Sequence, residues 1–197
     1  MEPDNEPFIP EDRKDIAPMV EVMAAIRELK KNDQALKNMI MIKTSSNTHN
    51  SLQIRKGQRI DFPEIMNVWE SSVKATHDFL KLEDFEFYKR IGSKDFLPAM
   101  DLYVLQLDEK IIGFIGVSDK HLEMLFVEAN SIGKGYGKAL LSYAVEHLGI
   151  TTLDVNEQNE KALTFYEKAG FRIVGRSEKD GMGKNYPILH MGIKVNI

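Results

Sequence analysis

Residues 127–141 read VEANSIGKGYGKALL, and these residues give the clearest indication of the fold. Gly133, Gly135 and Gly137 alternate between an apolar segment that ends at Val127 and a run whose apolar residues recur with helical spacing. Glycine lets the backbone approach a ligand closely and adopt conformations that other residues avoid. The free N–H groups and the positive dipole end of a helix start bind anions. The stretch therefore predicts a phosphate or pyrophosphate site between a strand and a helix.

The spacing of these glycines excludes the two best-known phosphate loops. A Walker loop has four residues between its first glycine and its Gly-Lys pair, followed by Ser or Thr. Here only three residues separate Gly133 from Gly137-Lys138, and Ala139 follows. The dinucleotide fingerprint needs two residues between its second and third glycines, and this loop has one. A nucleotide hydrolase is disfavoured, while a tight strand-to-helix turn without a ligand stays open at this point.

Strand and helix patterns alternate on both sides of the loop. Period-two or continuous apolar segments predict strands over residues 52–55, 102–107, 111–117, 121–127, 152–155, 171–176 and 188–195. Helical spacing predicts helices that begin at Phe62, with Asp61 as the N-cap, and over residues 82–91, 135–148 and 159–169. The pattern indicates an α/β (α+β) domain over residues 51–197, with a mixed sheet and helices on both faces.

The first fifty residues have a different character. Apolar residues recur every three or four positions from Ile16 to Ile40, and a polar tract follows over residues 43–51. This predicts an N-terminal helical arm and a linker, residues 1–50, in front of the main domain.

Composition excludes several classes of protein. The chain has no cysteine, which rules out disulfides, cysteine-ligated zinc and a thiol nucleophile, and no other metal site is predicted. The net charge of −4 among 197 residues argues against nucleic-acid binding. No apolar run is long enough to cross a membrane. The acidic start, residues 1–6, predicts no secretory signal, so we expect a cytoplasmic protein.

Residues 153–171, LDVNEQNEKALTFYEKAGF, form a second informative block. Together with the glycine loop, this block resembles the GNAT superfamily of N-acetyltransferases, whose pyrophosphate loop follows Gln/Arg-x-x-Gly-x-Gly/Ala. Gly135 and Gly137 match the two small positions, whereas Ile132 stands at the Gln/Arg position and departs from the pattern. Residues 75–80 and 155–159 further resemble a YjaB-like bacterial branch of the family. The resemblance covers about residues 52–197.

The resemblance implies a GNAT fold with a mixed, mostly antiparallel sheet, and acetyl-CoA as the cofactor. It implies that the strand ending at Val127 and the strand at residues 153–155 splay apart to admit the pantetheine arm. A primary amine would then attack the thioester directly. The implied cofactor-binding residues are Met124, Leu125, Phe126, Val127, Ile132, Gly133, Lys134, Gly135, Tyr136, Gly137, Lys138, Asn159 and Tyr166.

Direct transfer requires one group to remove a proton from the amine and another to supply one to the thiolate. The resemblance makes Tyr166 the general acid, although it could be a packing tyrosine. Glu123 and His77 are the two candidates for the base, and each has a structural alternative. Asn159 is expected to contact the cofactor arm, to cap its helix, or to do both.

Other interpretations stay open on the sequence alone. The domain could be a non-catalytic acyl-CoA sensor, or the N-terminal helices could make the chain an interaction module. The acceptor could be a small-molecule amine or a protein amine, and its pocket could be walled by Trp69, Phe79 and Tyr186. A homodimer is one arrangement that the sequence allows.

Overall fold

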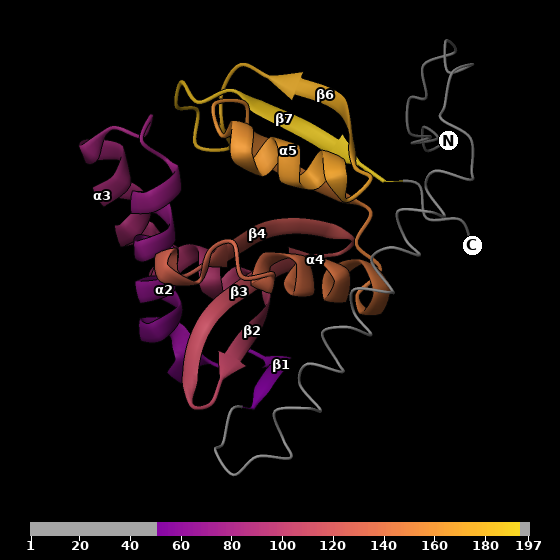
Figure 1. Ribbon diagram of the computed structural model, residues 1–197. Helices are drawn as coiled ribbons and strands as arrows, with labels where there is room; N and C mark the ends of the chain where they lie inside the picture. Colours follow the sequence, from indigo (N-terminus) through magenta and orange to yellow (C-terminus); the bar gives the residue numbers. More distant parts are fainter. Residues whose placement is uncertain (1–50, 194–197) are drawn as a thin grey trace, which may run out of the picture.

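The computed structural model describes residues 51–193, which form one seven-stranded sheet with helices on both faces (Figure 1). The strand order is β1-β2-β3-β4-β5-β7-β6, and every neighbouring pair is antiparallel except β4–β5. The strands are β1 (Leu52–Lys56), β2 (Asp101–Leu107), β3 (Lys110–Ser118), β4 (His121–Val127), β5 (Thr152–Asn156), β6 (Arg172–Ser177) and β7 (Ile188–Gly192). The expected mixed, mostly antiparallel sheet is confirmed. The expected arm and linker over residues 1–50 lie outside the described residues.

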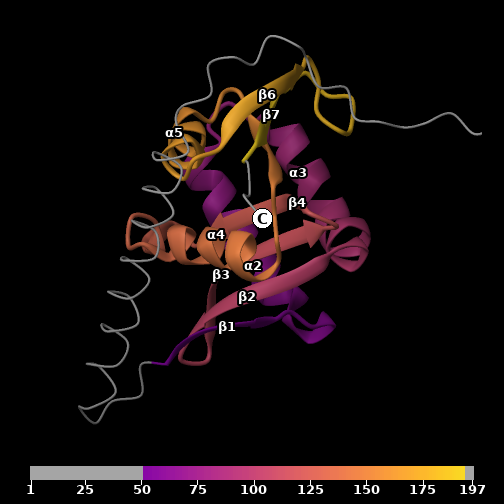
Figure 2. The ribbon, with the colours of Figure 1, turned by 90° about the vertical axis from the view of Figure 1, so that its right-hand side faces the viewer.

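Within residues 51–193, four α-helices accompany the sheet. They are α2 (Phe62–Thr76), α3 (Leu82–Ile91), α4 (Tyr136–His147) and α5 (Glu160–Lys168). Short helical turns lie at Arg59–Asp61, Gly92–Phe96, Leu97–Ala99 and Ala129–Ser131. In Figures 1 and 2, α4 lies over the β3–β4 half of the sheet and α5 lies beside β6 and β7. None of these described helices is long and apolar enough to cross a membrane.

The helices cover opposite faces because successive strand residues point in opposite directions. Leu105 and Ile115 belong to a core with α4 and α5, whereas their strand neighbours Val104 and Phe114 belong to a second core with α2 and α3. Both faces of the central strands are therefore buried. Consistent with this, β3 is buried along almost its whole length.

Asp61 occupies the N-cap position of α2, which begins at Phe62 as expected, but its side chain makes no capping hydrogen bond. Its carboxylate accepts hydrogen bonds from the Arg55 guanidinium at 2.7 and 2.9 Å and from the Gln58 backbone N–H at 2.8 Å. An ion pair with β1 thus fixes the start of the helix, and a tertiary contact of this kind cannot be read from local sequence.

The sheet opens between β4 and β5. These parallel strands pair only at His121–Thr152 and Leu122–Leu153. On the other side of β4, Leu122 pairs with Val117 and Met124 pairs with Gly116, so Glu123 is the extra residue of a β-bulge. The two strands therefore begin to diverge at the bulge. This divergence agrees with the splayed strands that the family resemblance implied.

Candidate active site

A cavity of about 670 Å³ lies where β4 diverges from β5. Its walls come from the second half of β4, the loop before α4, and α5. The predicted cofactor-binding residues that line this cavity are Leu125, Phe126, Val127, Ile132, Gly133, Gly135, Gly137, Lys138, Asn159 and Tyr166. The tertiary structure therefore gathers two sequence blocks and a strand around one space.

The loop before α4 presents free backbone amides to this cavity. Gly133 and Gly135 have φ angles of +81° and +88°, a region that favours glycine, and no other atom lies within 4 Å of where their Cβ atoms would be. Within residues 51–193, no backbone acceptor is bonded to the N–H groups of residues 133–138. Side chains at these two glycines would project into open space beside the free amides at the start of α4. This arrangement fits a phosphate or diphosphate group.

The charges on the cavity wall agree with an anionic ligand. Lys138, Lys161 and Lys168 line the cavity, and no carboxylate does so among the described residues. The chain as a whole has 30 acidic and 26 basic residues, so this local excess of cations is not a consequence of composition. An elongated ligand with phosphates at one end and an uncharged arm along β4, such as acetyl-CoA, fits the cavity.

Tyr166 lies on the α5 wall with its ring buried against Phe171 and Phe165. Burial raises the pKa of its hydroxyl, so the group stays protonated in neutral and mildly alkaline solution. Within residues 51–193 the hydroxyl has no hydrogen-bond partner, and the residue lines the cavity. A protonated hydroxyl that reaches the cavity and is free to donate is suited to the role of a general acid.

Asn159 is placed for both of the roles expected of it. Its side-chain oxygen accepts a hydrogen bond from the Ala162 N–H at 3.1 Å, which caps α5. The same residue lines the larger cavity. The cap uses the oxygen, so the amide NH₂ of Asn159 remains able to donate to a ligand.

A second cavity of about 230 Å³ lies on the α2–α3 side of the sheet. Its walls are mainly apolar and aromatic, and the expected wall residues Trp69, Phe79 and Tyr186 all line it. Trp69 is held in place by stacking on Phe85, with ring centroids 5.4 Å apart. The charged residues that line it are Glu123 and Asp180, and no lysine or arginine does so among the described residues.

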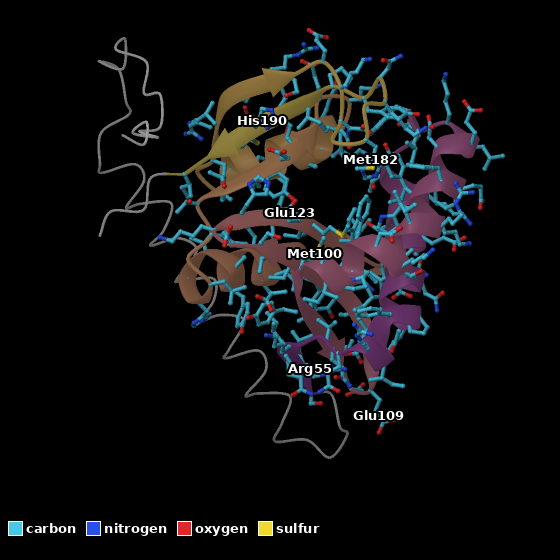
Figure 3. All side chains as sticks on the ribbon, turned by 180° about the vertical axis from the view of Figure 1, so that it is seen from behind. Arg55, Met100, Glu109, Glu123, Met182 and His190 are labelled. Atoms are coloured by element: carbon cyan, nitrogen blue, oxygen red, sulfur yellow. The ribbon has the colours of Figure 1, made fainter. Side chains whose placement is uncertain are left out.

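The β-bulge explains how Glu123 reaches the smaller cavity. Leu122 packs into the core on the α4–α5 face, whereas Glu123 and Met124 both line the cavity on the other face. Two successive strand residues can face the same side at a bulge. Figure 3 shows Glu123 at the level where β4 separates from the β6–β7 half of the sheet. Its side chain is exposed and has no hydrogen-bond or ion-pair partner within residues 51–193.

His77 lies where the two cavities meet, since it and Phe126 line both. Its ring is 5.3 Å from that of Phe79 and 6.2 Å from that of Phe126, and its Nδ1 is 2.8 Å from Thr76 Oγ1. Burial lowers the pKa of His77 to about 4, and the nearby Asp78 carboxylate offsets only part of that shift. The imidazole is therefore neutral at physiological pH.

The outer wall of the smaller cavity is closed by contacts between α3 and the segment before β7. Asp84 accepts hydrogen bonds from the Lys184 ammonium and, at 2.5 Å, from the Tyr186 hydroxyl. Lys184 and Tyr186 lower the pKa of Asp84, so this carboxylate stays ionised and paired. The Tyr88 hydroxyl donates to Asp180 in the same way. These contacts join residues about one hundred positions apart in the chain, which sequence patterns do not reveal.

Not every predicted residue lies on the larger cavity. Met124, Glu123 and His77 line the smaller one, and His77 lines both. Lys134 and Tyr136 line neither, although they stand in the same loop. The sequence interpretation missed several lining residues, of which the chemically informative ones are Ser72, Thr76, Lys161 and Lys168 in the larger cavity and Tyr88, Asn156 and Asp180 in the smaller. Lys161 and Lys168 lie on one face of α5, and their seven-residue spacing in the sequence is the signal that could have revealed this.

Comparison with known proteins agrees with this geometry. The family described as acetyltransferase (GNAT) domain matches residues 71–193. The peptidyl-lysine N-acetyltransferase YjaB of Salmonella typhimurium is 37% identical over 141 residues, which is 71% of this chain and 97% of that protein.

Two solved structures show the same fold. The solution structure of apo YjaB from Escherichia coli has a TM-score of 0.66 and 36% identity, covering 72% of this chain and 97% of that one. The PaiA N-acetyltransferase of Thermoplasma acidophilum, crystallised with coenzyme A, has a TM-score of 0.55 and 24% identity, covering 71% and 98%. At that identity the second likeness concerns the fold alone. The cavity between the splayed strands, the phosphate loop and the family match together establish that the chain belongs to the GNAT family of acetyl-CoA-dependent N-acetyltransferases.

Proposed function

We propose that this enzyme acetylates the side-chain amine of lysine residues in a peptide or protein. The observation that carries the proposal is the opposite charge of two cavities that meet at His77 and Phe126. Among the described residues, the charged side chains that line the larger cavity are all lysines and suit an anionic acyl donor. Those that line the smaller cavity are both carboxylates and suit an ammonium group. Aromatic walls would pack along the methylene chain of a lysine. The peptidyl-lysine activity in the name of the Salmonella relative supports this choice.

We propose Glu123 as the general base in preference to His77. Glu123 lines the smaller cavity, and its carboxylate has no hydrogen-bond or ion-pair partner among residues 51–193, so it can accept the proton of an incoming ammonium directly or through water. The pKa of His77, about 4, leaves it a weak base, and its position between Phe79 and Phe126 suits it to shape the passage.

Acetyl-CoA supplies an acetyl group activated as a thioester. The part of β4 beyond Leu122 is free of β5, so a backbone N–H near Leu125 or Phe126 can donate a hydrogen bond toward the carbonyl oxygen of a bound acyl group. Tyr166, protonated and on the opposite wall, can supply a proton to the departing sulfur. The reaction then needs no protein nucleophile.

We also propose that residues 51–197 form the catalytic domain and that the protein acts in the cytoplasm. The two cores and both cavities are formed within residues 51–193, which supports the first point. The second point is compatible with a chain that has no cysteine and so needs no oxidising compartment to form disulfides.

The test is acetylation of lysine-containing peptides, with the modified atom located by mass spectrometry. We expect transfer to the lysine Nε, and Glu123→Gln should lower kcat/KM by about 100-fold because the base is lost. The affinity for acetyl-CoA should stay within about two-fold, since Glu123 does not line the larger cavity.

The matched control is Glu109→Gln, the same change in the exposed turn between β2 and β3, distant from Glu123 in Figure 3. It should leave kcat/KM unchanged. Acetylation confined to small amines, with no lysine peptide accepted, would contradict the proposed acceptor. Equal activity of Glu123→Gln and wild type would remove Glu123 from its role.

A further inference from the structure

Two lysines that acetyl transfer does not use lie on the α5 wall of the larger cavity. Lys161 and Lys168 are seven residues apart, which is close to two helical turns, so both lie on one face about 10 Å apart. Phe165 lies on the same face between them, and all three residues line the cavity.

This helix face is opposite the phosphate loop. A ring atom of Phe165 lies 3.7 Å from where a Cβ atom on Gly137 would be, and Gly137 is in the first turn of α4. Lys161 and Lys168 are therefore about one turn to either side of the point where α5 comes nearest to the loop. A lysine side chain can reach across such a distance toward a ligand held by the loop.

The two ammonium groups have no counter-charge in the described part of the chain. Neither Lys161 nor Lys168 forms an ion pair within residues 51–193, and the described cavity wall contains no carboxylate. The loop already offers the amides of residues 133–138 and the charge of Lys138 to one diphosphate. The α5 pair is thus additional cationic charge that a diphosphate alone does not require.

We propose that Lys161 and Lys168 bind the ribose 3′-phosphate of coenzyme A and make the enzyme select coenzyme A over its 3′-dephospho form. Coenzyme A carries a 5′-diphosphate and a 3′-phosphate on the same ribose, so a diphosphate held by the loop keeps the 3′-phosphate nearby. A phosphate monoester close to doubly ionised at neutral pH is attracted to two ammonium groups. The proposal rests on the assignment of the larger cavity to coenzyme A.

The test is calorimetric titration of the full chain with coenzyme A and with 3′-dephospho-coenzyme A. Wild type should bind coenzyme A about ten-fold or more tightly than the dephospho form, because exposed ion pairs contribute up to a few-fold each. In the double variant Lys161→Gln/Lys168→Gln, this ratio should fall to about one while the dephospho affinity stays within about two-fold. The wild-type ratio should also shrink as salt is added, because ions screen exposed charges.

The control is Lys94→Gln/Lys120→Gln, which removes the same charge at two exposed lysines that line neither cavity. Its ratio should match that of wild type. Equal wild-type affinity for the two ligands, or a ratio unaffected by the α5 changes, would overturn the proposal while leaving coenzyme A in the cavity. Failure of wild type to bind either ligand would instead overturn the assignment of the cavity itself.

Discussion

The proposed chemistry depends on where the fold places single residues. Tyr166 and Glu123 line different cavities, with the passage at His77 and Phe126 between them. One is a hydroxyl whose pKa is raised by the burial of its residue, and the other is an exposed carboxylate without a partner in the described chain. A donor and an acceptor of protons on opposite sides of the reacting atoms are what a direct transfer between an amine and a thioester requires.

Tyr166→Phe tests the acid. The change removes one oxygen and keeps the ring that packs on Phe171, so the fold and the acetyl-CoA affinity should be nearly unchanged. We expect kcat to fall about 100-fold, because the departing thiolate loses its proton donor. Steady-state kinetics and calorimetry measure the two quantities separately.

Tyr143→Phe is the matched control. Tyr143 lies on α4 with its ring 5.5 Å from that of Tyr103, and it lines neither cavity. Its kcat should equal that of wild type. If Tyr166→Phe turned over as fast as this control, Tyr166 would be a packing residue and another group would protonate the sulfur.

At the scale of elements, the divergence of β4 from β5 and the loop before α4 create the donor site. Two residue pairs hold the parallel strands together, and the bulge at Glu123 marks where they part. The loop then turns through two left-handed glycines, Gly133 and Gly135, which both line the cavity. In the proposed function, the strand edge forms hydrogen bonds with the cofactor arm and the helix start binds the phosphates.

Comparison of Gly135→Ala with Gly149→Ala separates ligand binding from backbone strain. Both glycines have a left-handed φ, +88° and +68°, and neither has an atom within 4 Å of its Cβ position. Each alanine should therefore lower the free energy of unfolding by roughly 1–2 kcal/mol. Urea unfolding measures this shared cost.

Only the first of the two variants should affect the donor site. Gly135 lines the larger cavity and Gly149 does not, so Gly135→Ala should weaken acetyl-CoA binding at least about ten-fold, or 1.4 kcal/mol. Gly149→Ala should bind as wild type does in calorimetry. Equal affinities in the two variants would place the phosphates somewhere other than this loop.

At the scale of the molecule, two cores on opposite faces of one sheet support two cavities of opposite charge. The α4–α5 core supports the walls of the larger cavity, and the α2–α3 core supports those of the smaller one. His77 joins them and is held neutral by burial, which lowers its pKa from 6.5 to about 4. The same burial links this junction to the stability of the whole protein.

Stability should therefore depend on pH through His77. Its folded pKa lies below its unfolded pKa, so between pH 6.5 and about 4 the unfolded chain binds more protons and acid favours unfolding. From pH 7.5 to pH 5, this group should lower the free energy of unfolding by at most about 2 kcal/mol. Urea unfolding at the two pH values, both above the ordinary pKa values of Asp and Glu, measures the change.

His77→Gln should lose most of that pH dependence, while His147→Gln, at an exposed position on α4, should keep it. An identical acid-induced loss in wild type and His77→Gln would show that the imidazole at the junction does not resist protonation.

Much of this molecule was determined by its sequence alone. Local patterns predicted nearly every strand and helix, because apolar periodicity and glycine positions are properties of neighbouring residues. The glycine spacing and the block at residues 153–171 indicated the phosphate loop and the family. Tyr166 and Asn159 were singled out from that block, and both line the larger cavity.

Other features of the site became apparent only in the folded protein, because they depend on contacts between residues that are distant in the chain. Asp61 stands at the N-cap of α2, as the sequence predicts, but its carboxylate is paired with Arg55 on β1 instead of capping the helix. The bulge that directs Glu123 into the smaller cavity arises from the register of β4 against β3. The opposite charges of the two cavities likewise appear only when strands, loops and helices meet in space, since a charge along the chain does not reveal which face or cavity it will occupy.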